Sequence, residues 1–389
     1  MYFKRDISEK ITSVAGQFPV VVLTGARQAG KTTLLKKLFP DYRFVSLDLP
    51  SQAHMAESEP ALFFQNFPPP LLIDEVQYAP GLFRNLKMVI DDNRHAMGQF
   101  ILTGSQKFTL MKAVSDSLAG RAAIFDLENL RAHELSLTPE DDVSAAMARG
   151  FYPELWRQPE LERSVFYPSY IVSYLERDIR QVLEVRNLRD FERFIRACAV
   201  RSGQLLNMSD LGRDVGIRSQ TAREWLGVLE ASNQISLLEP YFENVGKRNV
   251  KSPKLYFNDP GMLCYLLGLE PGNLTNTPLI GAIFEALIYA EFRKRAAVLA
   301  DGSQLYFYRD GQGREIDFLH IIGGKINLLE AKWSENPGRR WADRMDEVAG
   351  ILSVSKTYAM GEKTLLCRTP HTFKIRDVWC RHVFDYFRD

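Results

Sequence analysis

The clearest chemical pattern in the sequence is a glycine-rich run near the N-terminus. The run GARQAGKT, from Gly25 to Thr32, has the spacing of a P-loop, and the helix-forming stretch TLLKKLF follows it. The glycines allow a tight turn whose backbone N–H groups point at phosphate oxygens, and the helix N-terminus adds a positive dipole end. We expect Lys31 to reach the β- and γ-phosphates of a nucleotide, and the Thr32 hydroxyl to bind Mg²⁺. The predicted nucleotide contacts are Gly25, Ala26, Arg27, Gln28, Ala29, Gly30, Lys31, Thr32 and Thr33.

Two carboxylates follow the next strongly apolar run, which the prolines PPP precede. Asp74 and Glu75 end the run LLI at residues 71–73. At the end of a buried strand beside a P-loop, Asp74 can hold Mg²⁺ through water, and Glu75 can polarise the attacking water as a general base. An isolated Asp-Glu pair at a strand end is usually part of a solvated turn. A P-loop at this distance along the chain favours the catalytic interpretation.

Two further polar residues are candidates for the same site, each with an ordinary alternative. Ser105 follows the apolar run 99–104 and could orient the water or sense the γ-phosphate, or it could simply be a polar strand terminus. Arg121 precedes the apolar run AAIFDL. It could be an arginine finger, within its own site or across a subunit interface, or a surface arginine paired with a carboxylate.

A second set of charged residues lies in the last third of the chain. Glu285 falls in the helical pattern GAIFEALIYAEFR, Asp317 in the apolar run REIDFLHII, and Glu330 and Lys332 at the end of INLLEAK. Glu330 and Lys332 are two apart, so they point to the same face of a strand. Asp317 and Glu330 could share Mg²⁺, Glu285 could add a ligand, and Lys332 could orient a hydrolytic water.

This order, an acid on a helix, an aspartate on a strand and E-x-K on the next strand, is the order of the PD-(D/E)xK nuclease core. Charged residues are common at strand ends, and E-x-K occurs often by chance. The pattern therefore leaves two interpretations open, a phosphodiesterase site and an amphipathic hairpin with charged edges.

The elements that must position the first set of residues are short apolar runs. The runs at 18–23, 71–75, 99–104 and 122–127 are rich in apolar and β-branched residues, which is typical of buried parallel strands. With the P-loop, they predict an α/β fold with a parallel sheet of the P-loop NTPase type over residues 1–135.

The middle of the chain predicts helices and then a winged helix. Residues 136–200 begin with a polar stretch, and apolar spacing from 161 to 196 predicts a helical linker region. Within 201–250, Ser209 is a possible helix N-cap, Gly216 marks a turn, and RSQTAREWLGVLEAS and ISLLEPYF predict a second helix and a strand. Helix, turn, helix and strand is the winged-helix order.

Basic and polar side chains in this region are candidates for nucleic-acid contacts. On the exposed start of the second helix, these are Arg218, Ser219, Gln220 and Arg223. In the basic loop 247–254, they are Lys247, Arg248, Lys251 and Lys254. Such a patch suits DNA or RNA phosphates. The alternative is a protein-docking module with an ordinary solvated loop.

The remaining residues, 251–389, predict a small α/β domain of the PD-(D/E)xK nuclease-like type. Strands are expected at 304–309, 314–322, 326–332 and 357–360.

Composition restricts the class of protein and its compartment. The chain has 389 residues, 46% hydrophobic and 25% charged, with a net charge of +1. A length of this order predicts two or three domains, and the neutral balance means that nucleic-acid binding would need a local basic patch. The four cysteines form no C-x-x-C pair. That pattern, with no apolar leader at the N-terminus and no membrane-length apolar run, predicts a cytoplasmic protein without membrane partners.

Several motifs together resemble one large prokaryotic family. They are GARQAGKT, LLIDEVQ, ILTGSQ and SLAGR, followed by GFYPEL and YLERDI. The family consists of AAA-type P-loop ATPases fused to a C-terminal domain of unknown function with a restriction-endonuclease-like core. The resemblance covers almost the whole chain and implies a five-stranded parallel core, ATP as the nucleotide, Ser105 on the sensor strand and Arg121 as the arginine of an L-x-G-R motif. It implies no assigned biological role.

Three functions are therefore open at this point. The first is an ATP-dependent enzyme acting on nucleic acid. The second is an ATP-driven regulatory switch that binds DNA or protein through a catalytically silent nuclease-like domain, and the third is an assembly factor that only docks partners. An arginine finger that acts across a subunit interface would require a homo-oligomer.

Overall fold

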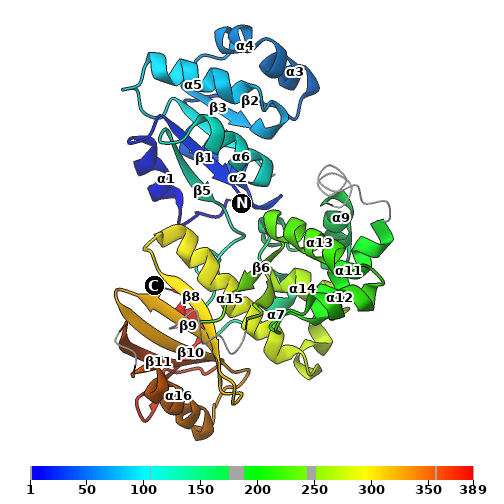
Figure 1. Ribbon diagram of the computed structural model, residues 1–389, viewed down its shortest axis with the longest axis vertical. Coiled ribbons are helices and arrows are strands. Elements are labelled where there is room, and N and C mark those ends of the chain that lie inside the picture. The colour runs from blue at the N-terminus through cyan, green and yellow to red at the C-terminus, as the bar shows by residue number, and fades with distance from the viewer. Residues whose placement is uncertain (1, 106, 175–187, 243–250, 355–356, 389) are drawn as a thin grey trace. The chain divides into compact units, whose positions relative to one another are not determined.

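A computed structural model describes the following parts of the chain: residues 2–105, 107–174, 188–242, 251–354 and 357–388 (Figure 1). Backbone contacts divide the chain into two compact units. The N-terminal unit consists of Met1–Leu130 and Ala231–Asn233, and the C-terminal unit of Arg131–Glu230 and Gln234–Asp389. None of the helices described is long and apolar enough to cross a membrane.

The N-terminal unit is built on a five-stranded parallel sheet. Its strands are β1 (Val20–Thr24), β2 (Arg43–Ser46), β3 (Leu71–Asp74), β4 (Phe100–Thr103) and β5 (Ala122–Asp126). They lie in the order β2-β3-β4-β1-β5, and every neighbouring pair is parallel. The three central strands are buried along their whole length, because helices cover both faces of a parallel sheet. The structure confirms the predicted parallel fold.

Helices connect these strands (Figure 1). They are α1 (Ser8–Ala15), α2 (Lys31–Leu38), α3 (Pro50–Ser58), α4 (Pro60–Asn66), the 3₁₀ turn η1 (Val76–Tyr78), α5 (Leu82–Asp92) and α6 (Lys107–Ser117). The helix predicted after the P-loop is α2. In α5, Leu82, Phe83, Leu86 and Ile90 lie on one face at helical spacing and are buried in the core of the unit.

The first half of the C-terminal unit is mainly helical. Its helices are α7 (Val143–Arg149), α8 (Pro153–Arg157), α9 (Arg163–Tyr174), α11 (Leu188–Val200), α12 (Met208–Val215), α13 (Ser219–Ala231), α14 (Pro260–Leu266) and the 3₁₀ turn η4 (Pro271–Asn276). The predicted helix at 161–196 corresponds to α9 and α11, and residues 175–187 of it lie outside the described part. The predicted linker region also contributes Phe151, Tyr167 and Phe191 to the main core of the unit, so its helices pack within the unit.

The segment predicted as a winged helix has the expected element order. Helices α12 and α13 are followed by strands β6 (Ile235–Leu238) and β7 (Lys254–Phe257), which pair antiparallel. The N-cap of α12 is Asn207, not Ser209, because the Asn207 side chain accepts hydrogen bonds from the backbone N–H groups of Ser209 and Asp210. Lys247 and Arg248 of the predicted basic loop lie outside the described residues.

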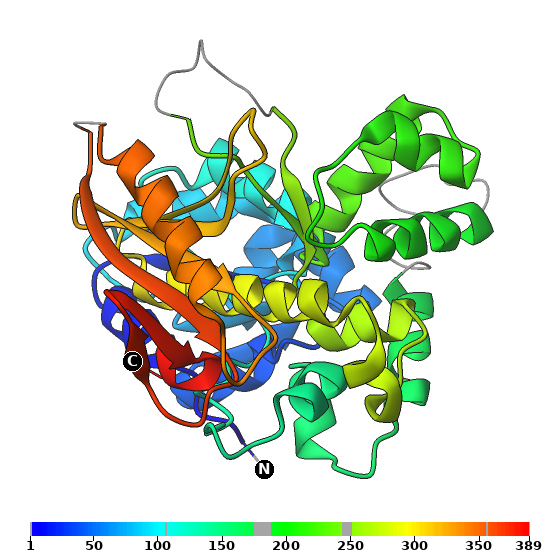
Figure 2. The same cartoon turned by 90° about the horizontal axis from the view of Figure 1, so that it is seen from below.

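A six-stranded mixed sheet forms the second half of the C-terminal unit (Figure 2). Its strands are β8 (Gln304–Arg309), β9 (Glu315–Ile322), β10 (Lys325–Ala331), β11 (Ala359–Cys367), β12 (Phe373–Ile375) and β13 (Val378–His382), in the order β12-β13-β11-β10-β9-β8. β11 runs parallel to both β10 and β13, and the other pairs are antiparallel. The predicted strand at 357–360 is the start of the longer β11.

Two helices give this sheet a separate core on each face. Helix α16 (Arg339–Leu352) places Ala342, Met345 and Val348 against one face. Helix α15 (Ile280–Leu299) belongs to the larger core on the other face, and a short helix, α17 (Val383–Tyr386), joins that core near the C-terminus. The acidic residues of the second set therefore come from α15 and from two adjacent central strands.

Candidate functional site

The P-loop connects β1 to α2 and contains two glycines in conformations that other residues rarely adopt. Gly25 has a φ of +137°, and a Cβ at this position would lie 2.2 Å from the carbonyl oxygen of Leu127. Gly30, the N-cap of α2, has a φ of +94°. Glycine avoids the steric cost at both positions, so the loop can turn tightly over the start of the helix.

Lys31 is buried at the first position of α2. Its Nζ donates hydrogen bonds to the carbonyl oxygens of Gly25 and Ala26, both at 2.9 Å. Burial lowers the pKa of Lys31, while the nearby carboxylates of Glu75 and Asp74 oppose this shift. The ammonium is therefore held within the loop itself, where a bound phosphate would gain most from a positive charge.

The predicted Mg²⁺ ligands are in direct contact. Thr32 Oγ1 donates to Asp74 Oδ1 at 2.8 Å, and Thr103 Oγ1 donates to the same oxygen at 2.6 Å. Hydroxyl and carboxylate oxygens are the ligands that Mg²⁺ prefers, and Mg²⁺ in nucleotide sites usually takes only one or two protein ligands. Thr32 and Asp74 therefore fit an ion that is bound together with nucleotide phosphates.

Glu75 follows Asp74 at the end of β3 and has a left-handed backbone, with a φ of 54°. Its Oε2 accepts hydrogen bonds from the amide of Gln77 and from the backbone N–H and hydroxyl of Ser105, the last two at 3.3 and 3.0 Å. Burial alone would raise the pKa of Glu75, but the hydrogen bond from Gln77, the charge of Lys31 and the hydrogen bond from Ser105 lower it. The carboxylate is thus stabilised in its charged form, as a general base requires.

Three residues of this site were not predicted from the sequence. Gln77 and Thr103 hold Glu75 and Asp74, and the position of Gln77 in LLIDEVQ, two residues after the acidic pair, was the available signal. Arg5 anchors the loop, because its guanidinium donates to the carbonyl oxygens of Ala29 and Glu128 at 2.9 and 2.6 Å. No spacing rule connects Arg5 to a P-loop that begins twenty residues later.

The other predicted nucleotide contacts lie in the same loop and at the start of the helix that follows it. Ala26, Arg27, Gln28 and Ala29 lie in the loop between β1 and α2, and Thr33 lies in the first turn of α2.

Arg121 lies at the amino-terminal ends of the parallel strands, whereas the P-loop lies at their carboxyl ends. It precedes Ala122, which pairs with Val20 at the start of β1, whereas the P-loop follows the end of β1. Its guanidinium forms two hydrogen bonds with Asp91, at 2.8 and 3.0 Å. The structure therefore contradicts an arginine finger within its own site and agrees with the alternative of an arginine paired with a carboxylate. A role across a subunit interface stays a prediction.

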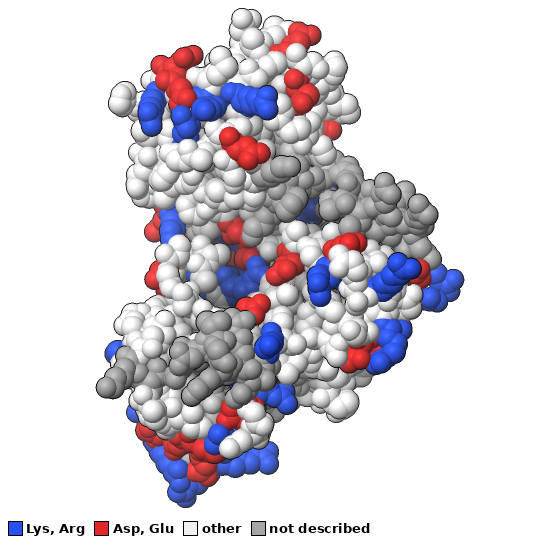
Figure 3. All heavy atoms as spheres, viewed as in Figure 1, with Lys and Arg blue, Asp and Glu red and all other residues white. Residues whose placement is uncertain are grey.

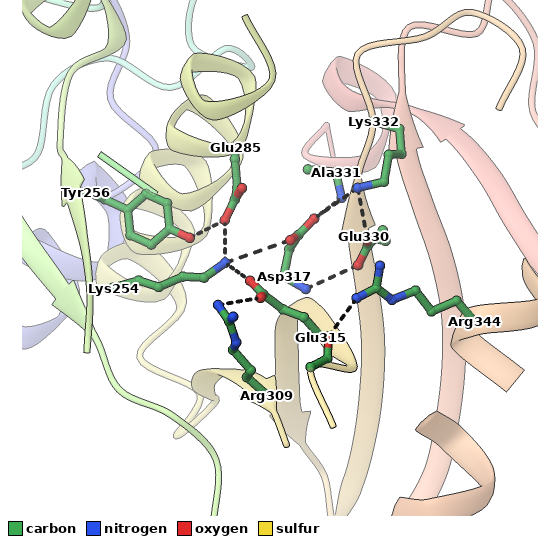
Figure 4. Close-up of polar contacts among 11 residues, drawn as sticks. Lys254, Tyr256, Glu285, Arg309, Glu315, Asp317, Glu330, Ala331, Lys332 and Arg344 are labelled. Atoms are coloured by element: carbon green, nitrogen blue, oxygen red, sulfur yellow. Dashed lines mark hydrogen bonds and ion pairs between the residues drawn. The ribbon is translucent and has the colours of Figure 1, made fainter. Parts of the chain in front are cut away.

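The four predicted residues of the C-terminal set come together (Figure 4). Lys332 Nζ lies 2.8 Å from Glu330 Oε1 and 3.7 Å from Asp317 Oδ2. The backbone N–H of Asp317 donates to Glu330 Oε2 at 3.3 Å, and that of Ala331 donates to Asp317 Oδ2 at 2.9 Å. Glu285, from α15, joins this group through a residue that was not predicted to be there.

That residue is Lys254, which was predicted to lie in an exposed basic loop. Its side chain is only 3% exposed, and its Nζ lies 3.0 Å from Glu285 Oε1 and 2.6 Å from Glu315 Oε1 (Figure 4). The prediction was wrong because Lys254 begins β7, a strand whose four residues are all buried. Tyr256, two residues later, also points inward and donates a hydrogen bond to Glu285.

The charge of Lys254 is stabilised by this environment. Burial would lower the pKa of Lys254, but the carboxylates of Glu285, Asp317 and Glu315 outweigh burial and raise it. One of the basic residues predicted for the loop, Lys254, is therefore buried. Lys251, which the structure also describes, is exposed.

Burial also affects the acids of this cluster. It raises the pKa of Glu285 to about 7 and that of Glu330 to about 8, and the neighbouring charge of Asp317 adds to both shifts. The lysines only partly oppose these shifts. Between pH 4.5 and 8, the folded chain therefore binds more protons at these two groups than the unfolded chain does.

We expect this difference to make the C-terminal unit less stable as pH rises from 5 to 8, since unfolding then releases protons. All five tryptophans lie in this unit, so their fluorescence during urea unfolding reports on it. His320 and His382 act in the opposite direction, because burial lowers their pKa values. The variant Glu330→Gln removes one of the two acids. It should lose less stability than the wild type between pH 5 and 8, and an equal loss would contradict a raised pKa at Glu330.

The C-terminal acids do not fit a divalent metal as they stand. In the described residues, no three His, Cys, Asp or Glu side chains are arranged to hold a metal ion. Lys254 contacts Glu285 Oε1, and Lys332 contacts Glu330 Oε1. The raised pKa of Glu330 also opposes metal binding, which requires the charged form. The predicted sharing of Mg²⁺ by Asp317 and Glu330 therefore has no support in this geometry.

The candidate nucleic-acid contacts at the start of α13 are exposed. Arg218, Ser219, Gln220 and Arg223 all lie at the surface, as predicted. One acidic side chain lies among them, since the Gln220 amide donates a hydrogen bond to Glu224. On the face shown in Figure 3, described basic and acidic side chains are interspersed in both units. The described residues on this face therefore form no wide basic surface.

Family profiles match three consecutive parts of the chain. Residues 17–136 match one described as an AAA domain, and residues 140–273 and 280–384 match domains of unknown function, DUF8612 and DUF4143. Two uncharacterised relatives, Rv2008c of Mycobacterium tuberculosis and Mb2031c of Mycobacterium bovis, are each 30% identical over 339 residues. These residues are 86% of this chain and 75% of each relative.

Two solved structures are similar to the chain at a low level. The Walker-type ATPase PABY2304 of Pyrococcus abyssi is 16% identical, with a TM-score of 0.42, over 68% of this chain and 96% of that one. A RuvB variant of Thermotoga maritima is 16% identical, with a TM-score of 0.32, over 59% and 86%. Similarity at this level carries no argument about function.

The parallel sheet, the P-loop and the acidic end of β3 define an AAA-type P-loop ATPase domain. The chain belongs to the prokaryotic family of AAA-type P-loop ATPases that carry a C-terminal domain of unknown function.

Proposed function

We propose that this protein binds and hydrolyses ATP with Mg²⁺, and that hydrolysis switches the state of a C-terminal unit that binds a partner rather than cutting it. The observation that carries the ATPase assignment is the convergence of Thr32, Asp74 and Glu75 beside the P-loop lysine. Thr32 and Asp74 hold Mg²⁺, Lys31 neutralises the phosphates, and Glu75 polarises the attacking water. The metal supplies charge stabilisation at the phosphates.

The test of nucleotide binding is Lys31→Ala. We expect this variant to lose tight ATP binding, because the ammonium is the charge closest to the phosphates, and to lose turnover with it. Isothermal titration with ATP and Mg²⁺ measures the binding. Lys37→Ala is the matched control, since Lys37 is exposed on the same helix. Unchanged ATP affinity in Lys31→Ala would overturn the assigned site.

For the C-terminal unit, the silent interpretation of the nuclease-like set is supported by the two lysines that engage its acids. We propose that α12, α13 and the β6–β7 hairpin act as a winged helix whose exposed residues Arg218 and Arg223 contact the partner. Nucleic acid as that partner makes a specific prediction, because phosphate contacts release counterions and therefore weaken steeply with salt. Binding that does not change with salt would indicate a protein partner.

Cleavage of nucleic acid is the second candidate function, favoured by the convergence of Asp317, Glu330 and Lys332. Labelled single- and double-stranded DNA and RNA are incubated with Mg²⁺ or Mn²⁺, with and without ATP. Under the silent interpretation, wild type and Asp317→Ala show the same trace of cleavage. Activity that disappears in Asp317→Ala, but remains in the exposed-loop variant Asp301→Ala, would establish the second candidate.

A further inference from the structure

Three carboxylates surround one buried ammonium in the C-terminal unit (Figure 4). Lys254 Nζ lies 3.0 Å from Glu285 Oε1, 2.6 Å from Glu315 Oε1 and 3.9 Å from Asp317 Oδ1. Glu315 and Asp317 are two apart on β9, so they point to the same face of the sheet, and Glu285 reaches them from α15. Three acids from two elements thus share one cation.

The acids around Lys254 are of the ligand type that divalent metals prefer, although with Lys254 in place the described acids are not arranged to hold such an ion. Carboxylate oxygens are the ligands that Mg²⁺, Mn²⁺ and Ca²⁺ prefer. An ammonium is a compact cation with three hydrogen-bond donors, so it can serve several carboxylates at once. Lys254 and a divalent cation would therefore compete for the same oxygens.

Lys254 cannot easily give up this position. Its side chain is 3% exposed, and it belongs to β7, whose residues Leu255, Tyr256 and Phe257 are all buried in the main core. β7 pairs with β6 along its whole length. Withdrawal of the ammonium from this fixed strand would leave buried carboxylates without this cation, which is costly.

The two oxygens of Asp317 are engaged by different lysines. Oδ1 faces Lys254, and Oδ2 lies 3.7 Å from Lys332 and accepts the backbone N–H of Ala331. The nuclease-like pattern requires Asp317 as a metal ligand, and in this fold Asp317 lies between two ammonium groups.

We propose that Lys254 is the resident cation of the Glu285–Glu315–Asp317 cluster, that it excludes divalent metals, and that its removal opens a latent divalent-cation site. This inference rests on the proposed silent C-terminal unit. The cluster then joins β7, α15 and β9 through fixed charges.

The test measures Mn²⁺ binding to the full chain by electron paramagnetic resonance, without nucleotide. All proteins carry Asp74→Asn, which removes the Mg²⁺ ligand of the ATPase site. In this parent we expect no Mn²⁺ binding that depends on Asp317. Lys254→Ala should bind one Mn²⁺ ion. We expect its dissociation constant to be at least about tenfold lower than that of any Mn²⁺ binding by the parent, and to be typical of weak sites with oxygen ligands. Lys254→Ala with Asp317→Asn should lose it again, and Lys254→Arg should bind none.

Two results would overturn the proposal. One is Mn²⁺ binding by the parent that disappears when Asp317→Asn is added. This comparison does not require Lys254→Ala to fold. The other is a folded Lys254→Ala that gains no Mn²⁺. Either result leaves the ATPase assignment intact, because that assignment is tested separately by Lys31→Ala. If the parent binds no Mn²⁺ but cleaves nucleic acid in a way that depends on Asp317, the result would instead overturn the proposal that the C-terminal unit binds its partner without cutting it.

Discussion

Replacing Glu75 by glutamine should abolish most ATP turnover and leave ATP binding nearly unchanged. The amide has nearly the shape of the carboxylate and can still contact Ser105, but it cannot accept a proton from the attacking water. A general base contributes about 10²–10⁴-fold to the rate, so we expect kcat to fall by about that factor. Lys31, Thr32 and Asp74 remain in place to bind ATP with Mg²⁺.

Phosphate release measures the turnover, and titration with ATP and Mg²⁺ measures the dissociation constant. Glu9→Gln is the matched control, because it makes the same chemical change at an exposed position in the same unit. Normal hydrolysis by Glu75→Gln would show that another group activates the water. A large loss of ATP affinity would instead show that Glu75 contributes to binding.

The N-terminal fold could be predicted in detail because its signals are local. A parallel strand buried on both faces must be a short apolar run, and a phosphate loop must have glycines at fixed spacing. The runs at β1, β3, β4 and β5 therefore identified their strands. The contact between Thr32 and Asp74 followed as well, since parallel strands bring their carboxyl ends to one edge of the sheet.

The role of Arg121 could not be predicted from its sequence motif alone. Its place in the L-x-G-R motif could be read from the sequence, but the strand it precedes begins at the edge of the sheet away from the P-loop. Its partner, Asp91, is 30 residues earlier in the chain, at the end of α5. Only the three-dimensional arrangement of α5 and β5 decides between an arginine finger within its own site and an arginine paired with a carboxylate.

Lys254 shows a second limit, which concerns burial. In VGKRNVKSPK it is one of several basic residues, and nothing in its neighbours distinguishes it from Lys251. Its interior position depends on strand β7 and on three acids that come from α15 and β9. A buried charge is tolerated only with such partners, and partners this distant in sequence cannot be recognised by spacing.

A buried ion pair on α15 leads to the largest expected effect on stability. Glu291 is fully buried, and its carboxylate accepts hydrogen bonds from Lys294 Nζ at 2.8 Å and from the backbone N–H of Ala132 at 3.3 Å. Lys294 is 2% exposed, and its Nζ lies 4.0 Å from the ring centroid of Phe151. The pair thus ties α15 to the segment that begins the C-terminal unit and to its core.

Glu291→Leu should lower the free energy of unfolding of the C-terminal unit by about 3–5 kcal/mol, because Lys294 then keeps a buried charge without this carboxylate. Urea unfolding followed by tryptophan fluorescence measures the change. Glu154→Leu is the matched control: Glu154 pairs with Arg157 at the same helical spacing but at the surface, where such a pair contributes about 0–1 kcal/mol.

The double variant Glu291→Leu/Lys294→Leu separates the cost of a buried charge that has lost the Glu291 carboxylate from the loss of the pair itself. Apolar residues of similar volume often replace a buried ion pair without loss, so the double variant should recover most of the stability that Glu291→Leu loses. A double variant as unstable as the single one would show instead that the hydrogen bond from Ala132 dominates. In that case, the main role of Glu291 is to hold the start of the C-terminal unit against α15, and the charge of Lys294 is secondary.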